Sequence, residues 1–300
     1  MAASLKPLDQ QVIVITGASS GIGLATAQLA AERGAKLVLV ARSGETLSEL
    51  AALINEAGGE AICVVADVGS RDEVLAAAQA ALNRFGRIDT WVNDAGVSIY
   101  GRLDQVSEAD SRRLFDTNFW GVVNGSLAAL PHLKRERGAL INVGSEVSDA
   151  VLPLQGMYSA SKHAVKGFTD ALRVEIEEVD KADVSITLIE PTAVDTPFPE
   201  HARNYMQSEP KLPTPLIEPQ RVAEAILKAA TGGGREVKVG AVSVLDTTVW
   251  KVLPALGAKL SALQVSRQQK DVPPRDAEGA LYRPGRSGRI HGEAPGSRAG

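Results

Sequence analysis

The sequence predicts an α/β domain built on a doubly wound parallel sheet. Short apolar runs, most of them rich in Val and Ile, alternate with segments of helical periodicity along most of the chain. Most of these runs lack a polar alternation, as is typical of parallel strands that are buried on both faces. The 300 residues are 44% hydrophobic and 23% charged, which is ordinary for a globular protein with a sizeable core.

The elements follow one another in a regular strand–helix order. Strands are expected at Val12–Ile15, Lys36–Val40, Ala61–Ala66, Thr90–Val92, Ala139–Val143, Val184–Ile189 and Glu236–Val239. Helices are expected between them, at Ile22–Arg33, Glu45–Ala57, Arg71–Phe85, Glu108–Glu136, Tyr158–Val179 and Pro219–Ala230. This alternation predicts right-handed βαβ units with helices on both faces of the sheet.

Charge and cysteine content exclude several classes of protein. A net charge of −4 gives no electrostatic footprint for nucleic acid, so no nucleic-acid partner is expected. The single cysteine, Cys63, cannot form an intramolecular disulfide and fits a reducing, cytoplasmic setting. No secretory signal or transmembrane span is expected, because the most apolar candidate, Thr247–Val265, is interrupted by Lys251, Pro254 and Lys259.

A glycine-rich turn joins the first strand to the first helix. The run Thr16–Gly23 reads TGASSGIG, and it contains Gly17, Ser19, Ser20, Gly21, Ile22 and Gly23. Glycines allow a pyrophosphate to approach the backbone closely, and a helix N-terminus offers free N–H groups and a partial positive charge. The position of this turn therefore predicts a dinucleotide site, whereas a purely structural turn would leave its hydroxyl residues unexplained.

Several motifs in a fixed order resemble the short-chain dehydrogenase/reductase family in its single-domain form. The Gly-x-x-x-Gly-x-Gly turn is followed by Asn93-Asp94-Ala95-Gly96, then by Asn118, Ser145 and the run Tyr158-Ser159-Ala160-Ser161-Lys162. The resemblance covers roughly residues 11–240. It implies a Rossmann-type sheet of about seven strands in the order 3-2-1-4-5-6-7. It also implies a homodimer or homotetramer.

Tyr158 and Lys162 are four residues apart, so a helix places them on one face. A tyrosine with a pKa near 10 is a poor base at neutral pH, and a nearby ammonium lowers that pKa. The resemblance implies that Tyr158 exchanges a proton with the substrate oxygen and that Ser145 polarises this oxygen. Lys162 would also hold the nicotinamide ribose, and Asn118 would hold a water of a proton relay.

The end of the second strand predicts the choice of cofactor. Sites that prefer NAD place an acidic residue there, but this strand ends in Ala41-Arg42-Ser43. Arg42 can pair with a ribose 2′-phosphate and Ser43 can donate to it, which favours NADP(H) over NAD(H); the alternative is that Arg42 is a surface cation. By resemblance, further cofactor contacts are Asp67, Val68, Asn93, Ala95, Gly96, Tyr158, Lys162, Pro191, Val194 and Thr196.

The chain departs from the family pattern at two positions, and a third residue nearby is unusual for its place. Asp94 replaces the usual second Asn of the Asn-Asn-Ala-Gly turn, which removes a donor. Thr192 replaces the usual Gly after Pro191, and threonine adopts a positive φ less readily than glycine. Glu190 is an unusual residue at a strand end beside a cofactor.

The domain organisation follows from composition. Residues 1–246 are expected to form the catalytic domain and residues 247–264 a helical extension. Residues 265–300 are rich in Arg, Pro and Gly and are expected to be mostly disordered, because they bury too little apolar surface to offset their ordering entropy.

These observations predict an NADP(H)-dependent oxidoreductase that interconverts an alcohol and a ketone or aldehyde. Mostly apolar residues near Ser145 and Tyr158 predict a fairly apolar small-molecule substrate, and no metal site is expected. Two alternatives remain: a silent NAD(P)-binding sensor or scaffold on the same fold, and a different enzyme such as an epimerase or dehydratase. The intact Ser145–Tyr158–Lys162–Asn118 group argues against the first alternative.

Overall fold

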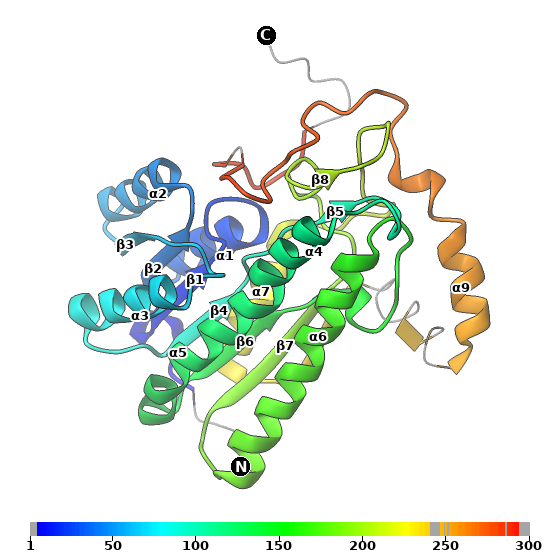
Figure 1. Ribbon diagram of the computed structural model, residues 1–300. Helices are drawn as coiled ribbons and strands as arrows, with labels where there is room; N and C mark the ends of the chain where they lie inside the picture. Colours follow the sequence, from blue (N-terminus) through cyan, green and yellow to red (C-terminus); the bar gives the residue numbers. More distant parts are fainter. Residues whose placement is uncertain (1–4, 241–246, 249, 251, 286, 294–300) are drawn as a thin grey trace.

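A seven-stranded parallel sheet forms the centre of the computed structural model, which describes residues 5–240, 247, 248, 250, 252–285 and 287–293 (Figure 1). The strand order is β3-β2-β1-β4-β6-β7-β9. These strands are β1 (Val12–Thr16), β2 (Lys36–Ala41), β3 (Glu60–Val65), β4 (Thr90–Asn93), β6 (Ala139–Val143), β7 (Ser185–Pro191) and β9 (Glu236–Val239). Numbered within the sheet alone, this is the order 3-2-1-4-5-6-7, so the predicted fold class is confirmed.

Two layers of helices cover the sheet. One apolar core packs α1 (Gly21–Glu32), α2 (Gly44–Glu56) and α7 (Pro219–Gly232) against one face. The other core packs α3 (Arg71–Phe85), α5 (Gly121–Glu136) and α6 (Gly156–Arg173) against the opposite face. All five residues of β1 are buried. This agrees with its unbroken Val/Ile run, because a strand that is covered by helices on both faces needs apolar side chains on both faces.

Two of the predicted helices are interrupted by π-helical turns. The segment predicted as Glu108–Glu136 consists of α4 (Glu108–Phe115), the π-turn η2 (Asp116–Trp120) and α5. The segment predicted as Tyr158–Val179 is α6 followed by the π-turn η4 (Val174–Val179). Such single turns inside helices are frequent at functional sites, and η2 carries Asn118.

Smaller elements gather around the carboxyl ends of the strands. The two-residue strands β5 (Ile99–Tyr100) and β8 (Arg203–Asn204) pair in parallel outside the main sheet. The short helix η3 (Glu146–Ser148) follows β6 directly, whereas η1 (Leu8–Gln10) precedes β1. Because β5 precedes α4 and β8 follows β7, this pair links the loops that border the cleft at this edge.

The C-terminal part contains helix α9 (Pro254–Ala262) and the short helix η5 (Ser266–Gln268). The expected boundary at residue 246 lies outside the described residues. The expected disorder of residues 265–300 differs from the structure, in which Ala280 is 5% and Leu281 0% exposed. The expectation of disorder considered only the apolar surface that the segment could bury within itself. In the structure, Leu281 is instead buried against the body of the protein. Residues 294–300 lie outside the described part.

None of the helices within the described residues is long and apolar enough to cross a membrane.

Candidate active site

The glycine-rich turn packs backbone against backbone. Gly17 has a φ of +76°, and a Cβ at this position would lie 2.8 Å from the amide nitrogen of Ala95. A Cβ on Gly23 would lie 2.3 Å from the carbonyl oxygen of Gly17. A side chain at either position would clash with this backbone. Because both residues are glycines, the turn between β1 and α1 can pack directly against the turn after β4. Ser20 caps α1 without a side-chain bond to the helix backbone, so the helix N-terminus faces the cleft.

The turn Asn93–Gly96 is anchored beneath the cleft. Asn93 donates to the side-chain oxygen of Asn142 at 2.9 Å and accepts from the Trp91 indole at 2.8 Å. The backbone N–H groups of Asp94 and Ala95 donate to the Thr16 hydroxyl. The turn therefore keeps its place although Asp94 replaces asparagine.

Asp94 is a partly buried acid rather than a neutral substitute for asparagine. Its carboxylate accepts a hydrogen bond from the Gly23 N–H. Burial raises the pKa of Asp94 to about 7, against the opposing effects of the Lys162 ammonium and the Gly23 N–H. The carboxyl group thus changes charge near neutral pH, directly beside the glycine-rich turn.

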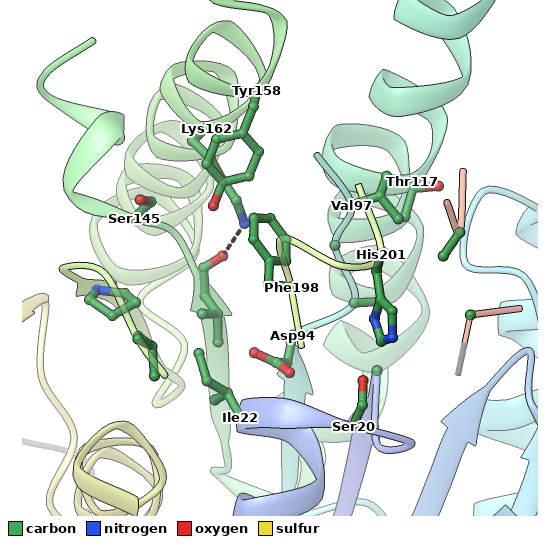
Figure 2. Close-up of a pocket in the computed structure, with 18 of the residues that line it drawn as sticks. Ser20, Ile22, Asp94, Val97, Thr117, Ser145, Tyr158, Lys162, Phe198 and His201 are labelled. Atoms are coloured by element: carbon green, nitrogen blue, oxygen red, sulfur yellow. Dashed lines mark hydrogen bonds between the residues drawn. The ribbon is translucent and has the colours of Figure 1, made fainter. Parts of the chain in front are cut away.

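Ser145, Tyr158 and Lys162 meet on one side of the cleft (Figure 2). Ser145 follows β6, whereas Tyr158 and Lys162 lie one turn apart on α6. The Ser145 hydroxyl hydrogen-bonds the Tyr158 phenol. The Lys162 ammonium donates to the Val143 carbonyl at 2.8 Å and lies 5.8 Å from the centre of the Tyr158 ring. Three residues that are distant in sequence are therefore assembled by one strand end and one helix.

Burial is the largest influence on the pKa values of Tyr158 and Lys162. It raises the pKa of Tyr158, and the hydrogen bond from Ser145 opposes the shift. Burial also lowers the pKa of Lys162 to about 8, whereas Asp94 favours its charged form. In this structure the phenol is therefore held in its protonated form, and the expected lowering of its pKa by Lys162 is not the dominant effect.

Asn118 lies directly behind this group and is fully buried. Its side-chain oxygen accepts from the Val97 N–H at 2.8 Å. Its side-chain amide donates to the Val97 carbonyl and to the Ser161 hydroxyl. Asn118 thus holds the chain after β4 against α6, close to Lys162.

Thr192 fits because two other residues accommodate it. Its hydroxyl donates to the Glu146 carboxylate at 2.8 Å, and its N–H donates to the Val239 carbonyl. A Cβ on Gly240 would lie 2.5 Å from the Thr192 methyl group, so a glycine there leaves room for threonine. The side chain that replaces the usual glycine therefore ties the loop after β7 to the loop of Ser145.

Glu190 belongs to an internal ion-pair cluster. The Lys166 ammonium lies 2.9 Å from Asp149, 3.5 Å from Glu190 and 2.9 Å from Glu236. Burial raises the pKa of Glu190, which is 0% exposed. Among the described residues these three acids are the one group close enough to share a metal ion, but the ammonium of Lys166 already supplies a cation there.

The opposite end of the cleft carries Arg42, Ser43, Asp67 and Val68. Arg42 donates to the backbone carbonyls of Ala280 and Leu281, at 2.5 and 3.2 Å. Asp67 pairs with Arg113 and accepts from the Gly69 N–H at 2.9 Å. The hydrogen-bond partners of Arg42 and the ion-pair partner of Asp67 are therefore residues that no sequence motif indicates.

One continuous cavity of about 210 Å³ connects these two ends. The predicted residues that line it are Gly17, Ser19, Ser20, Ile22, Arg42, Ser43, Asp67, Val68, Ala95, Gly96, Ser145, Tyr158, Lys162, Pro191 and Val194. Gly21, Gly23, Asn93, Asn118 and Thr196 do not line it; Gly21, for example, packs against the Thr196 methyl group.

Sequence reasoning missed part of the lining. The ring centre of Phe198 lies 5.4 Å from that of Tyr158. The lining also contains four residues that no sequence motif marks: His201, Leu212, Ala280 and Ser287. The buried hydroxyl of Thr117 in this lining has no hydrogen-bond partner in the described protein. No motif marked Ala280 or Ser287, because small residues in a Pro/Gly-rich tail carry no chemical signature.

The strand order, the glycine-rich turn and the cleft at the carboxyl ends of the strands define a dinucleotide-binding α/β fold. A family model described as short chain dehydrogenase matches residues 11–207. The chain therefore belongs to the short-chain dehydrogenase family of oxidoreductases, as the sequence motifs predicted.

Individual relatives agree with this assignment. An uncharacterized oxidoreductase, YxnA of Bacillus subtilis, is 45% identical over 93% of this chain and 79% of its own length. An alcohol dehydrogenase from Thermococcus sibiricus, solved with 5-hydroxy-NADP, is 30% identical with a TM-score of 0.68 and covers 78% of this chain and 97% of its own. A short-chain dehydrogenase/reductase from Burkholderia phymatum, solved with NAD, is 25% identical with a TM-score of 0.74. The match covers 91% of this chain and 99% of the Burkholderia chain.

Proposed function

We propose that this protein is an NADP(H)-dependent oxidoreductase that interconverts an alcohol with a ketone or aldehyde. The observation that carries the proposal is the meeting of Ser145, Tyr158 and Lys162 in a cleft that continues to the glycine-rich turn. A phenol, a hydroxyl and an amine beside a dinucleotide site are suited to proton exchange with a substrate oxygen.

The residues of the cleft fit a dinucleotide. The Cβ-free positions Gly17 and Gly23 and the N-terminus of α1 offer the close backbone approach that a pyrophosphate needs. The Thr117 hydroxyl supplies a polar group that has no hydrogen-bond partner among the described residues. Arg42 and Ser43 would face the ribose 2′-phosphate of NADP(H), and Lys162 the nicotinamide ribose. Related structures with 5-hydroxy-NADP and with NAD support the cofactor class.

When bound, the nicotinamide supplies or accepts the hydride. Tyr158 would donate its phenol proton to the carbonyl oxygen during reduction, and it would take that proton back during oxidation. The protonated state that burial favours at Tyr158 suits the donating role. Ser145 would hold the same oxygen through its hydroxyl, and the Lys162 ammonium would stabilise the phenolate after transfer.

Asn118 is proposed to support the proton relay behind Lys162. Its side chain is engaged by Val97 and Ser161, so we assign it a positioning role rather than direct contact with a relay water.

The substrate end of the cleft favours a fairly apolar reactant. Val147, Leu152, Phe198 and Leu212 line it beside Tyr158. Glu146, Gln155 and His201 are polar members of the lining, and the Glu146 carboxylate accepts a hydrogen bond from the Thr192 hydroxyl. A small ketone or alcohol with an apolar substituent fits this combination better than a charged metabolite does.

Assembly and location are further parts of the proposal. Leu75, Trp120 and Leu127 are 44%, 51% and 47% exposed on α3, η2 and α5, and they support an interface between copies of this chain. We therefore expect a homodimer or homotetramer, and light scattering at the monomer mass would contradict this. The single free cysteine supports a cytoplasmic setting.

The test is a panel of ketones and alcohols with NADPH, NADH and their oxidised forms, followed through the near-ultraviolet absorbance of the reduced cofactor. We expect turnover of apolar ketones and a higher kcat/KM with NADPH than with NADH. Tight binding of NADPH without turnover of any reactant would favour the silent sensor or scaffold instead.

A further inference from the structure

The C-terminal segment crosses the cofactor cleft. We call residues 277–285 and 287–293 the C-terminal strap. In Figure 1 its red trace runs from the neighbourhood of β8 towards α1. Ala280, Pro284, Gly285 and Ser287 of the strap line the same cavity as the glycine-rich turn and Tyr158. The strap is therefore a wall of the proposed cofactor site.

The strap is anchored first on the substrate side. The Ala280 N–H donates to the His201 carbonyl at 2.7 Å, and the Asn204 N–H donates to the Ala277 carbonyl at 2.9 Å. Leu281 is fully buried in an apolar cluster with Val97, Ile99 and Leu114. These contacts fix the strap beside the loop that follows β7.

The strap then reaches the phosphate-binding side. The Gly288 N–H donates to the Ser19 carbonyl at 2.8 Å, and the Gly21 N–H donates to the Arg289 carbonyl at 2.9 Å. The hydroxyls of Thr46 and Ser287 lie 2.6 Å apart. A backbone carbonyl of the strap thus occupies an N–H at the start of α1, where an anion would otherwise be stabilised.

Arg42 is the most informative contact. Its two terminal nitrogens donate to the carbonyl oxygens of Ala280 and Leu281. A phosphate is recognised by the same fork of guanidinium N–H groups, and it binds more strongly than a neutral carbonyl because the hydrogen bonds are charge-assisted on both sides. The strap and a 2′-phosphate therefore compete for one side chain.

We propose that the C-terminal strap is a cofactor-specificity element: it holds Arg42 through the Ala280 and Leu281 carbonyls and must release it before a ribose 2′-phosphate can bind. This rests on the proposed NADP(H) dependence. Either cofactor has to displace the Arg289 carbonyl from the start of α1, but only NADPH also has to displace the Ala280 and Leu281 carbonyls from Arg42. The docked strap therefore narrows the difference in affinity between NADPH and NADH. Loosening the strap should therefore favour NADPH selectively, since any loss of the cavity wall affects both cofactors alike.

Gly279→Ala is the variant that tests this in the full chain. Gly279 has a φ of +56°, and a Cβ there would lie 2.5 Å from the carbonyl oxygens of His201 and Ala202. Alanine should therefore displace the strap at its anchor without altering any group in the catalytic or phosphate-binding machinery. Leu281→Ala, which empties part of the apolar anchor, is the second variant and gives the same comparison if the first does not fold.

The readout is the ratio of the dissociation constants of NADH and NADPH, measured by fluorescence titration. We expect the strap variants to raise this ratio about tenfold, the effect of one charge-assisted hydrogen bond. Arg283→Ala is the matched control, because Arg283 lies in the strap and, within the described part of the chain, its side chain pairs with Asp276 alone at the surface. An unchanged or lowered ratio in the strap variants would overturn the proposal.

Combining each strap variant with Arg42→Ala separates the two hypotheses. If Arg42→Ala alone leaves the ratio unchanged, the proposed NADP(H) preference through Arg42 is wrong. If Arg42→Ala lowers the ratio but the strap variants do not raise it, the strap proposal is wrong and the cofactor assignment stands. The increase should vanish when Arg42 is absent.

Limited trypsin digestion of the unaltered protein gives an independent readout. Arg289, which is followed by Ile290, lies in the strap and becomes a cleavage site when the strap is displaced. Saturating NADPH should accelerate cleavage there more than saturating NADH does. Protection by NADPH would mean that the strap closes over the bound cofactor, and this would contradict competition for Arg42.

Discussion

The Tyr158 end of the cleft is built from regular elements, whereas the Arg42 end is completed by a segment from the far end of the chain. At the first end, Ser145 follows β6, and Tyr158 and Lys162 project from α6. At the second end, Arg42 is held by two backbone carbonyls of the strap. Strands and helices fix the proposed catalytic group, whereas the side chain proposed to recognise the cofactor's ribose is held by backbone contacts that can be exchanged. Four substitutions test this contrast.

Tyr158→Phe should produce the largest effect, because it removes the phenol proton that we propose is passed to the substrate oxygen. We expect kcat to fall by about 10²–10⁴-fold, the contribution of a positioned acid–base group. The dissociation constant of NADPH should change little, because phenylalanine keeps the ring and the other expected cofactor contacts remain. A variant that keeps the wild-type kcat would contradict the assigned role.

Arg42→Ala tests the second end. NADPH should bind about 10–100-fold more weakly, because a charge-assisted contact to the phosphate is lost, while the affinity for NADH stays within a few-fold. Arg33→Ala is the matched control, since Arg33 ends α1 and pairs with Glu224 away from the cleft. Equal losses for NADPH and NADH would show that Arg42 does not distinguish them.

Asp94→Asn extends the comparison to the pH dependence of the free energy of unfolding. The folded-state pKa of about 7 lies above the ordinary 3.8, so the stability linked to Asp94 is fully present below the ordinary pKa and is lost as the pH rises through 7. Without cofactor, Asn should stabilise the protein by about 1–2 kcal/mol at pH 8 relative to its effect at pH 4, less than the full shift because the site is partly exposed. Urea unfolding at both pH values measures this, and a pH-independent difference would contradict it.

Thr192→Val should have the smallest effect, because it keeps the shape and removes one hydroxyl. Loss of the hydrogen bond to Glu146 should cost about 1 kcal/mol of unfolding free energy. Thr187→Val, which also removes a threonine hydrogen bond in β7 but leaves the loop of Ser145 untouched, is the control. We expect only Thr192→Val to raise KM for the carbonyl substrate. If both variants have the same KM, Thr192 has no part in positioning that loop.

The sequence predicted the regular parts of the molecule well. Unbroken Val/Ile runs such as the one in β1 mark strands covered on both faces, and the glycine-rich turn places the dinucleotide end. The placement of Tyr158 and Lys162 on one face of α6 was also predictable from the sequence, because helical periodicity depends only on local residues.

The remaining features depend on partners that are distant in sequence. Nothing near Thr192 indicates that Gly240 makes room for it and that Glu146 accepts its hydroxyl. Nothing near Glu190 points to Lys166. The strap escaped prediction for the same reason, because Leu281 is a lone apolar residue until Val97, Ile99 and Leu114 surround it.

Transfer of deuterium from C4-labelled NADPH to a ketone, followed by mass spectrometry of the alcohol, tests the central claim most directly. The account predicts that the unaltered protein places the label on the carbinol carbon and that Tyr158→Phe binds the labelled cofactor but transfers almost none of it. Binding of NADPH by the unaltered protein with no label in any product of the ketone panel would contradict the account.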